Sequence, residues 1–141
     1  MRYKVKYDLL VIIALSIAFF GFVFGFKILN PTYIDWLLTS GGDTFGQFIA
    51  WQFYRNEPIT FPFGIIHSYL YPLGTSIVYG DGIPLIAIPI QIFCKSIATQ
   101  IQYMGLWLLS CYILQGVVAW MLCGYITKKS IPRILATLFL Y

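Results

Sequence analysis

Long apolar runs alternate with one long mixed segment along the chain. Residues 9–26 read LLVIIALSIAFFGFVFGF, without a single charge. At ~1.5 Å per residue, a helix of this length nearly crosses a hydrocarbon core of ~30 Å. A second uncharged run covers residues 104–126, and a third apolar run extends from 131 to 141. This pattern predicts two transmembrane helices and the start of a third, and we expect the chain to be the N-terminal part of a longer protein.

The first run has an alternative interpretation as a secretory signal peptide. Basic residues precede it (Arg2, Lys4 and Lys6), which is also typical of a signal sequence. However, the run is long for a signal core, and no A-x-A-like cleavage site follows it. We therefore predict an uncleaved transmembrane helix. Its Gly21-x-x-x-Gly25 pattern resembles a weak helix-packing motif.

Residues 27–103 form the connection between the two predicted spans. Residues 43–54 show apolar side chains at helical spacing (Phe45, Phe48, Ile49 and Phe53), while Arg55 lies off that stripe. This predicts a short amphipathic helix, which ends before Pro58 because the residue before proline avoids the helical region. The turn-rich stretch that follows, from Pro58 to Asp81, should pack at the outer surface.

The segment 83–98 is apolar but is interrupted by Pro84 and Pro89. It could cross the membrane or lie at its surface. If it does not cross, the N-terminal basic residues and the cluster of Lys128, Lys129 and Arg133 fall on one side, as the positive-inside rule prefers. We therefore predict a surface helix here and a cytoplasmic N-terminus.

Composition supports an all-α, polytopic membrane protein. Hydrophobic residues make up 60% of the chain and charged residues only 10%, and the mean hydropathy is +0.80. A soluble domain of 141 residues could not bury that much apolar surface. Soluble, disordered and nucleic-acid-binding proteins are thus excluded. We interpret the net charge of +4 as a determinant of orientation in the membrane and not as a sign of a nucleic-acid partner. With one His and no CxxC pair, a zinc finger is excluded as well.

Two carboxylates in the connection are candidates for chemistry. Asp43 follows two glycines at the start of the predicted 43–54 helix, where it could act as a general base or bind a metal ion. Alternatively, Ser40-x-x-Asp43 fits a capping box. Asp81, in Gly80-Asp81-Gly82, could be a second carboxylate of the same site, or simply a turn residue and N-cap.

Three further polar residues are candidates for substrate binding. His67 could bind a phosphate, and Arg55 and Lys95 could hold a lipid phosphate. The alternatives are an ordinary hydrogen-bonded histidine and solvated or snorkelling charges. Gln115, near the middle of the second span, should bond a neighbouring helix.

Two strings carry a resemblance to a known family. They are NPTYIDWLLTSGGDTFGQFIAWQFYRNEPITFPFG and YPLGTSIVYGDGIPLIAIPI, and they resemble DUF6311, a bacterial family of membrane proteins. The order of the predicted elements is similar to that of GT-C type membrane glycosyltransferases. In both, a first span is followed by a long outer loop that opens with a Gly-Asp helix, and then by a second span with basic residues after it. These include protein O-mannosyltransferases and aminoarabinose transferases.

The resemblance implies a function at the outer face of the bacterial cytoplasmic membrane. Such enzymes take a sugar from a polyprenyl-phosphate donor, and an acid in the first outer loop is their base or metal ligand. Carried over, that acid is Asp43 in Gly42-Asp43, with Asp81 as a second acid and a divalent metal as a possible cofactor. The alternatives are a non-enzymatic envelope-assembly or scaffold protein and a transporter segment. The sugar, the acceptor and the oligomeric state are left open.

Overall fold

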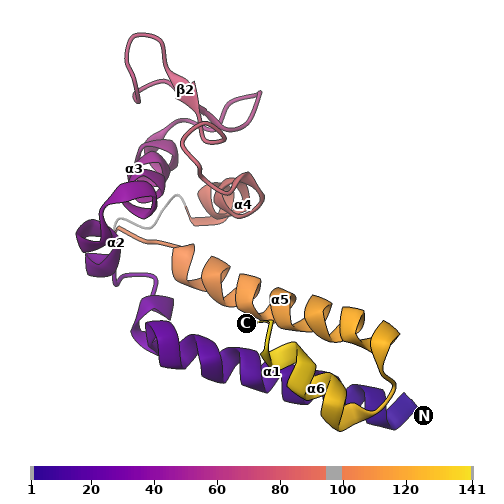
Figure 1. Ribbon diagram of the computed structural model, residues 1–141. Helices are drawn as coiled ribbons and strands as arrows, with labels where there is room; N and C mark the ends of the chain where they lie inside the picture. The colour runs from indigo at the N-terminus through magenta and orange to yellow at the C-terminus, as the bar shows by residue number, and fades with distance from the viewer. Residues whose placement is uncertain (1, 95–99, 141) are drawn as a thin grey trace. The chain divides into compact units, whose positions relative to one another are not determined.

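The computed structural model describes residues 2–94 and 100–140, and it is mostly helical (Figure 1). The chain divides into two compact units, residues 1–27 with 105–141 and residues 28–104. The first unit holds α1 (Arg2–Phe24), α6 (Ser130–Leu138) and all of α5 (Met104–Ile126) except its first residue. The second holds the helices α2 (Asp35–Ser40), α3 (Gly42–Asn56) and α4 (Pro84–Cys94), and the strands β1 (Ile65–Ile66) and β2 (Thr75–Ser76). A 3-10 turn, η1 (Phe26–Leu29), joins the two units.

Two helices of the first unit are long and apolar enough to cross a membrane. The stretch Tyr7–Phe24 of α1 has a mean hydropathy of 2.3, and α5 has 1.8. Only 17% and 22% of their residues are buried within the protein. An apolar helix that its own protein leaves uncovered suits a lipid environment better than water. The helices coincide with the runs that the sequence pattern singled out.

Aromatic side chains pack α1 against α5. The ring of Tyr112 on α5 lies 5.9 Å from that of Phe20 and 5.6 Å from that of Phe24, both in edge-on geometry. Such pairs add to the burial of apolar surface. The hydroxyl of Ser130 donates a hydrogen bond of 2.8 Å to Asp8, which ties the start of α6 to α1.

The Gly21-x-x-x-Gly25 pattern ends α1 instead of pairing two helices. Gly25 has a φ of 73° and donates its N–H to the carbonyl of Gly21 at 3.0 Å, as a helix C-terminal glycine does. A Cβ at Gly21 would overlap the ring of Phe26, which folds back onto this position. The close contact is therefore made within one segment.

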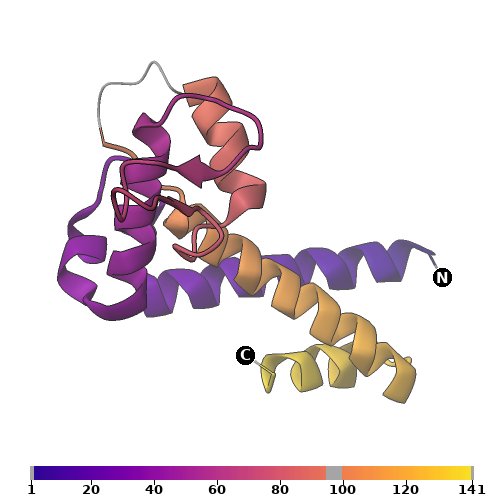
Figure 2. The same ribbon diagram turned by 90° about the horizontal axis from the view of Figure 1, so that it is seen from above.

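Helix α6 follows α5 after a short turn (Figure 2). The side-chain amide of Gln115, near the middle of α5, donates to the carbonyl of Leu140 at 2.7 Å. Leu140 lies two residues beyond the end of α6, so Gln115 bonds the segment after that helix and not the neighbouring helix that we expected. With nine residues, α6 is only about 14 Å long, and the start of a third span at 131–141 stays a prediction.

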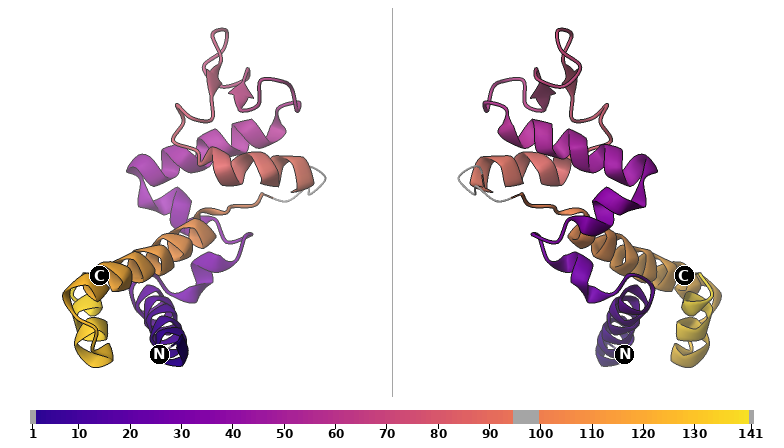
Figure 3. Two further views of the ribbon diagram at one scale, coloured as in Figure 1. Left: turned by 90° about the vertical axis from the view of Figure 1, so that its right-hand side faces the viewer. Right: turned by 90° about the vertical axis from the view of Figure 1, so that its left-hand side faces the viewer.

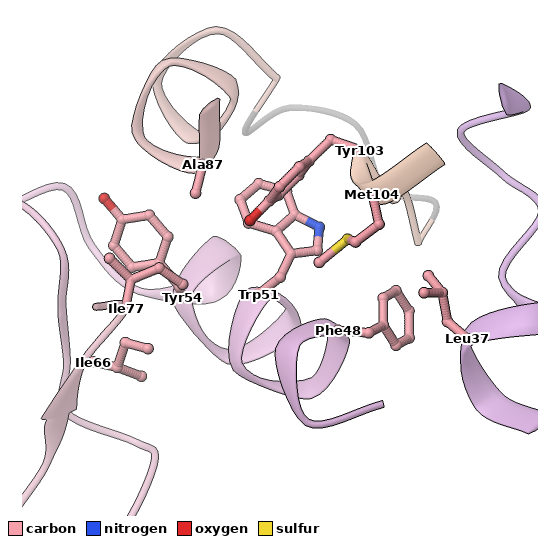
Figure 4. Packing of buried hydrophobic residues seen from close by; sticks show 9 residues of the cluster. All are labelled: Leu37, Phe48, Trp51, Tyr54, Ile66, Ile77, Ala87, Tyr103 and Met104. Carbon is pink, nitrogen blue, oxygen red and sulfur yellow. The ribbon is translucent and has the colours of Figure 1, made fainter. Parts of the chain in front are cut away.

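The second unit packs around the buried face of α3 (Figure 4). The indole ring of Trp51 meets the ring of Tyr103 edge-on at 5.0 Å, and its N–H donates to the carbonyl of Ile101 at 2.7 Å. Phe48 and Tyr54 fill the same face. The predicted helix 43–54 is confirmed, with one turn more than its pattern suggested.

Helices α3 and α4 run side by side, with the β hairpin beyond α3 (Figure 3). Gln91 on α4 is 2% exposed, and its amide donates to the carbonyl of Tyr54 at 2.8 Å and to that of Glu57 at 3.2 Å. It thereby satisfies backbone acceptors at the C-terminal end of α3. The predicted helix at 83–98 is found as α4, and its last four residues lie outside the described residues.

Candidate functional site

A cavity of about 330 Å³ lies in the second unit, where the first turns of α3 meet the hairpin loop and the turn before α4. We call it the acidic cavity, because both Asp43 and Asp81 line it. Tyr69, Thr75 and Tyr79 supply further polar groups to its wall. The structure thus brings together the two carboxylates that the sequence analysis singled out.

Asp43 reaches the acidic cavity because two glycines turn the chain sharply between α2 and α3. Gly41 and Gly42 have φ values of 64° and 59°, a region that residues with a Cβ rarely adopt. The N-cap of α3 is Gly41, which has no side chain, so Ser40 does not occupy the capping position that the expected capping box requires. Asp43 is exposed in the first turn, where the helix dipole favours its charge.

Asp81 is placed by close packing of its neighbours. A Cβ at Gly80 would overlap Ala50 of α3, and one at Gly82 would overlap Ile77. The turn can therefore approach α3 closely only with glycine at position 80, and it can fold back onto Ile77 only with glycine at position 82. The backbone of Asp81 lies in the left-handed region, with a φ of 53°, a conformation that aspartate tolerates better than most residues.

The N-cap role expected for Asp81 is wrong. The first helical hydrogen bond of α4 runs from the N–H of Ala87 to the carbonyl of Ile83, at 2.8 Å. Ile83 is therefore the capping position, two residues beyond Asp81. This leaves the carboxylate of Asp81 without a capping function.

The donor set of the acidic cavity limits which metal it suits. Among residues 2–94 and 100–140, no three His, Cys, Asp or Glu side chains gather into a metal-binding group. Two carboxylates alone are few for calcium or zinc, but magnesium is commonly held by one or two carboxylates, with water and substrate phosphates as further ligands. Asp43 and Asp81 fit that last arrangement.

The other predicted site residues do not line the acidic cavity. His67 is exposed on the hairpin loop and lies near Glu57. Arg55 is 7% exposed, so it is not the solvated charge that the sequence analysis gave as the alternative to a phosphate ligand. It sits in the last turn of α3. Lys95 lies outside the described residues.

Glu57 is a buried acid that the sequence pattern did not single out. It is 6% exposed, and it accepts hydrogen bonds from the hydroxyl and the N–H of Ser68, the latter at 2.7 Å. Burial by itself raises the pKa of Glu57, but the donors of Ser68 and the charge and N–H of His67 together lower it. Glu57 is therefore a charged anchor between α3 and the hairpin.

A second hollow of about 330 Å³ lies beside the same hairpin. Its walls carry the amides of Gln52 and Asn56, the hydroxyl of Ser68 and the ring of Phe53. The ring of Phe53 lies 4.9 Å from that of Tyr69, which lines the acidic cavity. We call this hollow the amide pocket.

In the amide pocket, the amide of Gln52 donates to the carbonyl of Ile101 at 3.1 Å, and that of Asn56 donates to the carbonyl of Gln52 at 2.8 Å. The hydroxyl of Ser68 donates to Glu57. The amide oxygens and remaining amide hydrogens, next to aromatic rings, are the groups left for a ligand with several hydroxyl groups.

The comparisons with known proteins give a single finding. A family model described as "Domain of unknown function (DUF6311)" matches residues 13–141. No curated protein and no solved structure matches the chain.

Proposed function

The chain belongs to the DUF6311 family, and on this premise we propose that it acts in an integral membrane glycosyltransferase. The reaction would move a sugar from a polyprenyl-phosphate donor to an acceptor of the bacterial envelope. The observation that carries the proposal is the meeting of Asp43 and Asp81 in one cavity of the segment between two apolar helices. The nearby amide pocket offers groups that suit a sugar.

In the proposed arrangement, α1 and α5 cross the cytoplasmic membrane and residues 30–103 lie at its outer face. The N-terminus and the basic residues after α5 then lie in the cytoplasm, in agreement with the positive-inside rule. A polyprenyl-phosphate donor keeps its sugar at the level of the lipid head groups. The exposed carboxylates of Asp43 and Asp81 would meet it there.

The reaction requires two functions: removal of the proton from the acceptor hydroxyl and neutralisation of the charge on the leaving phosphate. The acceptor hydroxyl attacks the anomeric carbon, the bond from that carbon to the phosphate oxygen breaks, and the hydroxyl proton passes to a base. Asp43 is the base in our proposal, because a positioned carboxylate within hydrogen-bond reach can take that proton. Asp81 holds the acceptor or shares a magnesium ion, which when bound would neutralise the leaving phosphate.

The test is the substitution Asp43→Asn in the protein expressed from its complete reading frame. Asparagine has nearly the same shape, and Asp43 is not the N-cap of α3, so the change removes only the interaction of one exposed charge with the helix dipole. Folding and membrane insertion should therefore persist. Membranes with a polyprenyl-phosphate sugar should lose at least ~10²-fold in sugar transfer, the low end of what a positioned base contributes. Asp81→Asn should cost less if Asp81 only orients the acceptor, and as much if both acids hold one metal.

Asp35→Asn is the matched control. Asp35 is also an exposed acid in the first turn of a helix, α2, but it does not line the acidic cavity. Its substitution should leave sugar transfer unchanged. If Asp43→Asn keeps the turnover of the wild type, the catalytic role is refuted, and a non-enzymatic role in envelope assembly becomes the better explanation.

A further inference from the structure

A second charged site lies in the first unit, apart from the acidic cavity. A cleft of about 400 Å³ opens between the last turns of α5 and the start of α6. We call it the basic cleft. Its walls are formed by Trp120, Met121, Gly124, Tyr125, Lys128 and Arg133. Among the residues that the structure describes, two cations and no acidic side chain line it.

The guanidinium group of Arg133 is held in place by Trp120. Its Nε donates to the carbonyl of Trp120 at 2.7 Å, and its central carbon lies 3.5 Å from the centre of the indole ring. Stacking on an aromatic face fixes the plane of the group and adds a cation–π attraction. Arginine has five N–H donors, and the Nε bond uses only one of them.

Gly124 makes room for this arrangement. A Cβ at this position would overlap the guanidinium of Arg133. Lys128, one turn further along, donates to the carbonyl of Gly124, which brings a second cation to the same end of α5. The indole N–H of Trp120 is buried and has no hydrogen-bond partner among the residues that the structure describes.

We propose that the basic cleft binds a phosphate group, as the head group of an anionic phospholipid or as free phosphate. A fixed guanidinium beside a flexible ammonium matches the donors that phosphate oxygens prefer. The cleft also lies at the end of α5, which is apolar and long enough to cross a membrane. In the proposed arrangement, where α5 spans the membrane, this end lies at the level of the lipid phosphates. This site is independent of the sugar chemistry proposed above.

The test measures which probes the purified chain retains in a neutral detergent. Short-chain phosphatidylglycerol, short-chain phosphatidylcholine and inorganic phosphate are compared by native mass spectrometry and by the shift in thermal unfolding. We expect retention of phosphatidylglycerol over phosphatidylcholine. Arg133→Gln and Lys128→Gln should each weaken it about fivefold, the effect of one basic residue close to a membrane surface. Retention of inorganic phosphate with the same dependence would identify free phosphate as the ligand and would equally support the site.

Two further variants distinguish a built site from general surface charge. Lys129→Gln removes the same charge from the neighbouring exposed residue, which does not line the cleft, and it should change retention little. Gly124→Ala removes no charge but displaces the Arg133 guanidinium, and it should weaken retention as Arg133→Gln does. Equal losses for Lys128, Lys129 and Arg133, or wild-type retention in Gly124→Ala, would overturn the proposal. The proposal would also be overturned if the wild-type chain retained neither phosphatidylglycerol nor inorganic phosphate.

Discussion

At the scale of single residues, Glu57 links the end of α3 to the hairpin through a buried charge. Its carboxylate accepts hydrogen bonds from the hydroxyl and the N–H of Ser68. Its own backbone N–H donates a hydrogen bond to the carbonyl of Tyr54 at 3.1 Å. A carboxylate that accepts several N–H and O–H groups is stabilised in its charged form. These contacts therefore stabilise the fold more when this group is ionised.

This dependence predicts how stability changes with pH. Because the fold lowers the pKa of Glu57, its contribution is complete above the ordinary value for glutamate, about 4.3, and is lost as the pH falls through the lowered folded value. In the variant Glu57→Gln that contribution is absent at every pH. The difference in unfolding temperature between wild type and variant should therefore be largest near neutral pH and shrink in acid. Thermal unfolding followed by circular dichroism in detergent measures it.

Other carboxylates titrate in both proteins, so their effects cancel in that difference. Asp35→Asn serves as the control, because Asp35 is exposed. Its difference from the wild type should be small throughout. A Glu57→Gln difference that stays constant from neutral to acid pH would show that the charge of Glu57 does not support the fold.

The residues of the acidic cavity could be found from the sequence, whereas Glu57 and the burial of Arg55 could not. Asp43 and Asp81 stand out because glycines flank them, and glycines mark the sharp turns and close approaches that expose a side chain. The environment of Glu57 depends on Ser68, eleven positions further on. A local pattern carries no information about which loop covers which residue.

At the scale of elements, the longer helices were predictable, whereas the six-residue helix α2 and the hairpin were not. The helical spacing of apolar residues in α3 and the apolar run of α4 are local signals, and a helix is found at each. The buried face of α3 differs from the predicted stripe, because Phe45 and Phe53 are 39% and 37% exposed, whereas Trp51 and Tyr54 are buried.

The strands β1 and β2 have two residues each, too few to show alternation. Their pairing, Ile65 with Ser76 and Ile66 with Thr75, depends on a loop in which Leu70 adopts a φ of 60°. Leucine at such a position gives no turn signal in the sequence.

The side-chain amide of Gln91 on α4 donates hydrogen bonds to the carbonyls of Tyr54 and Glu57 at the end of α3, and we call this contact the α3–α4 clamp. It leads to a prediction about Gln91. Gln91→Met keeps the length and approximate volume of the side chain but removes both amide hydrogen bonds. The buried carbonyl of Glu57 then loses a donor, which should lower the free energy of unfolding by about 1–3 kcal/mol. Denaturant unfolding in detergent measures this change. Gln47→Met, on the half-buried side of α3, is the control, and an equal loss there would show that the clamp does not matter.

At the scale of the whole molecule, the division into spans and connection was predictable from length and charge alone. Two uncharged runs of sufficient length are enough to locate α1 and α5. That residues 28–104 form a compact unit with a core of their own was not predictable. This core joins Leu37 to Met104 across most of the connection, so it depends on contacts between residues far apart in the chain.

The last prediction concerns whether α4 crosses the membrane. With eleven residues, α4 is about 16 Å long, roughly half of a hydrocarbon core. Leu85 and Phe93, near its two ends, are 80% and 84% exposed. In a background without Cys94, Cys111 and Cys123, we expect Leu85→Cys and Phe93→Cys both to react with an impermeant maleimide on intact cells. Lys129→Cys should react only after the membrane is opened. If Phe93→Cys reacts only from the cytoplasm, α4 crosses, the basic cluster after α5 lies outside, and the orientation proposed for the acidic cavity fails.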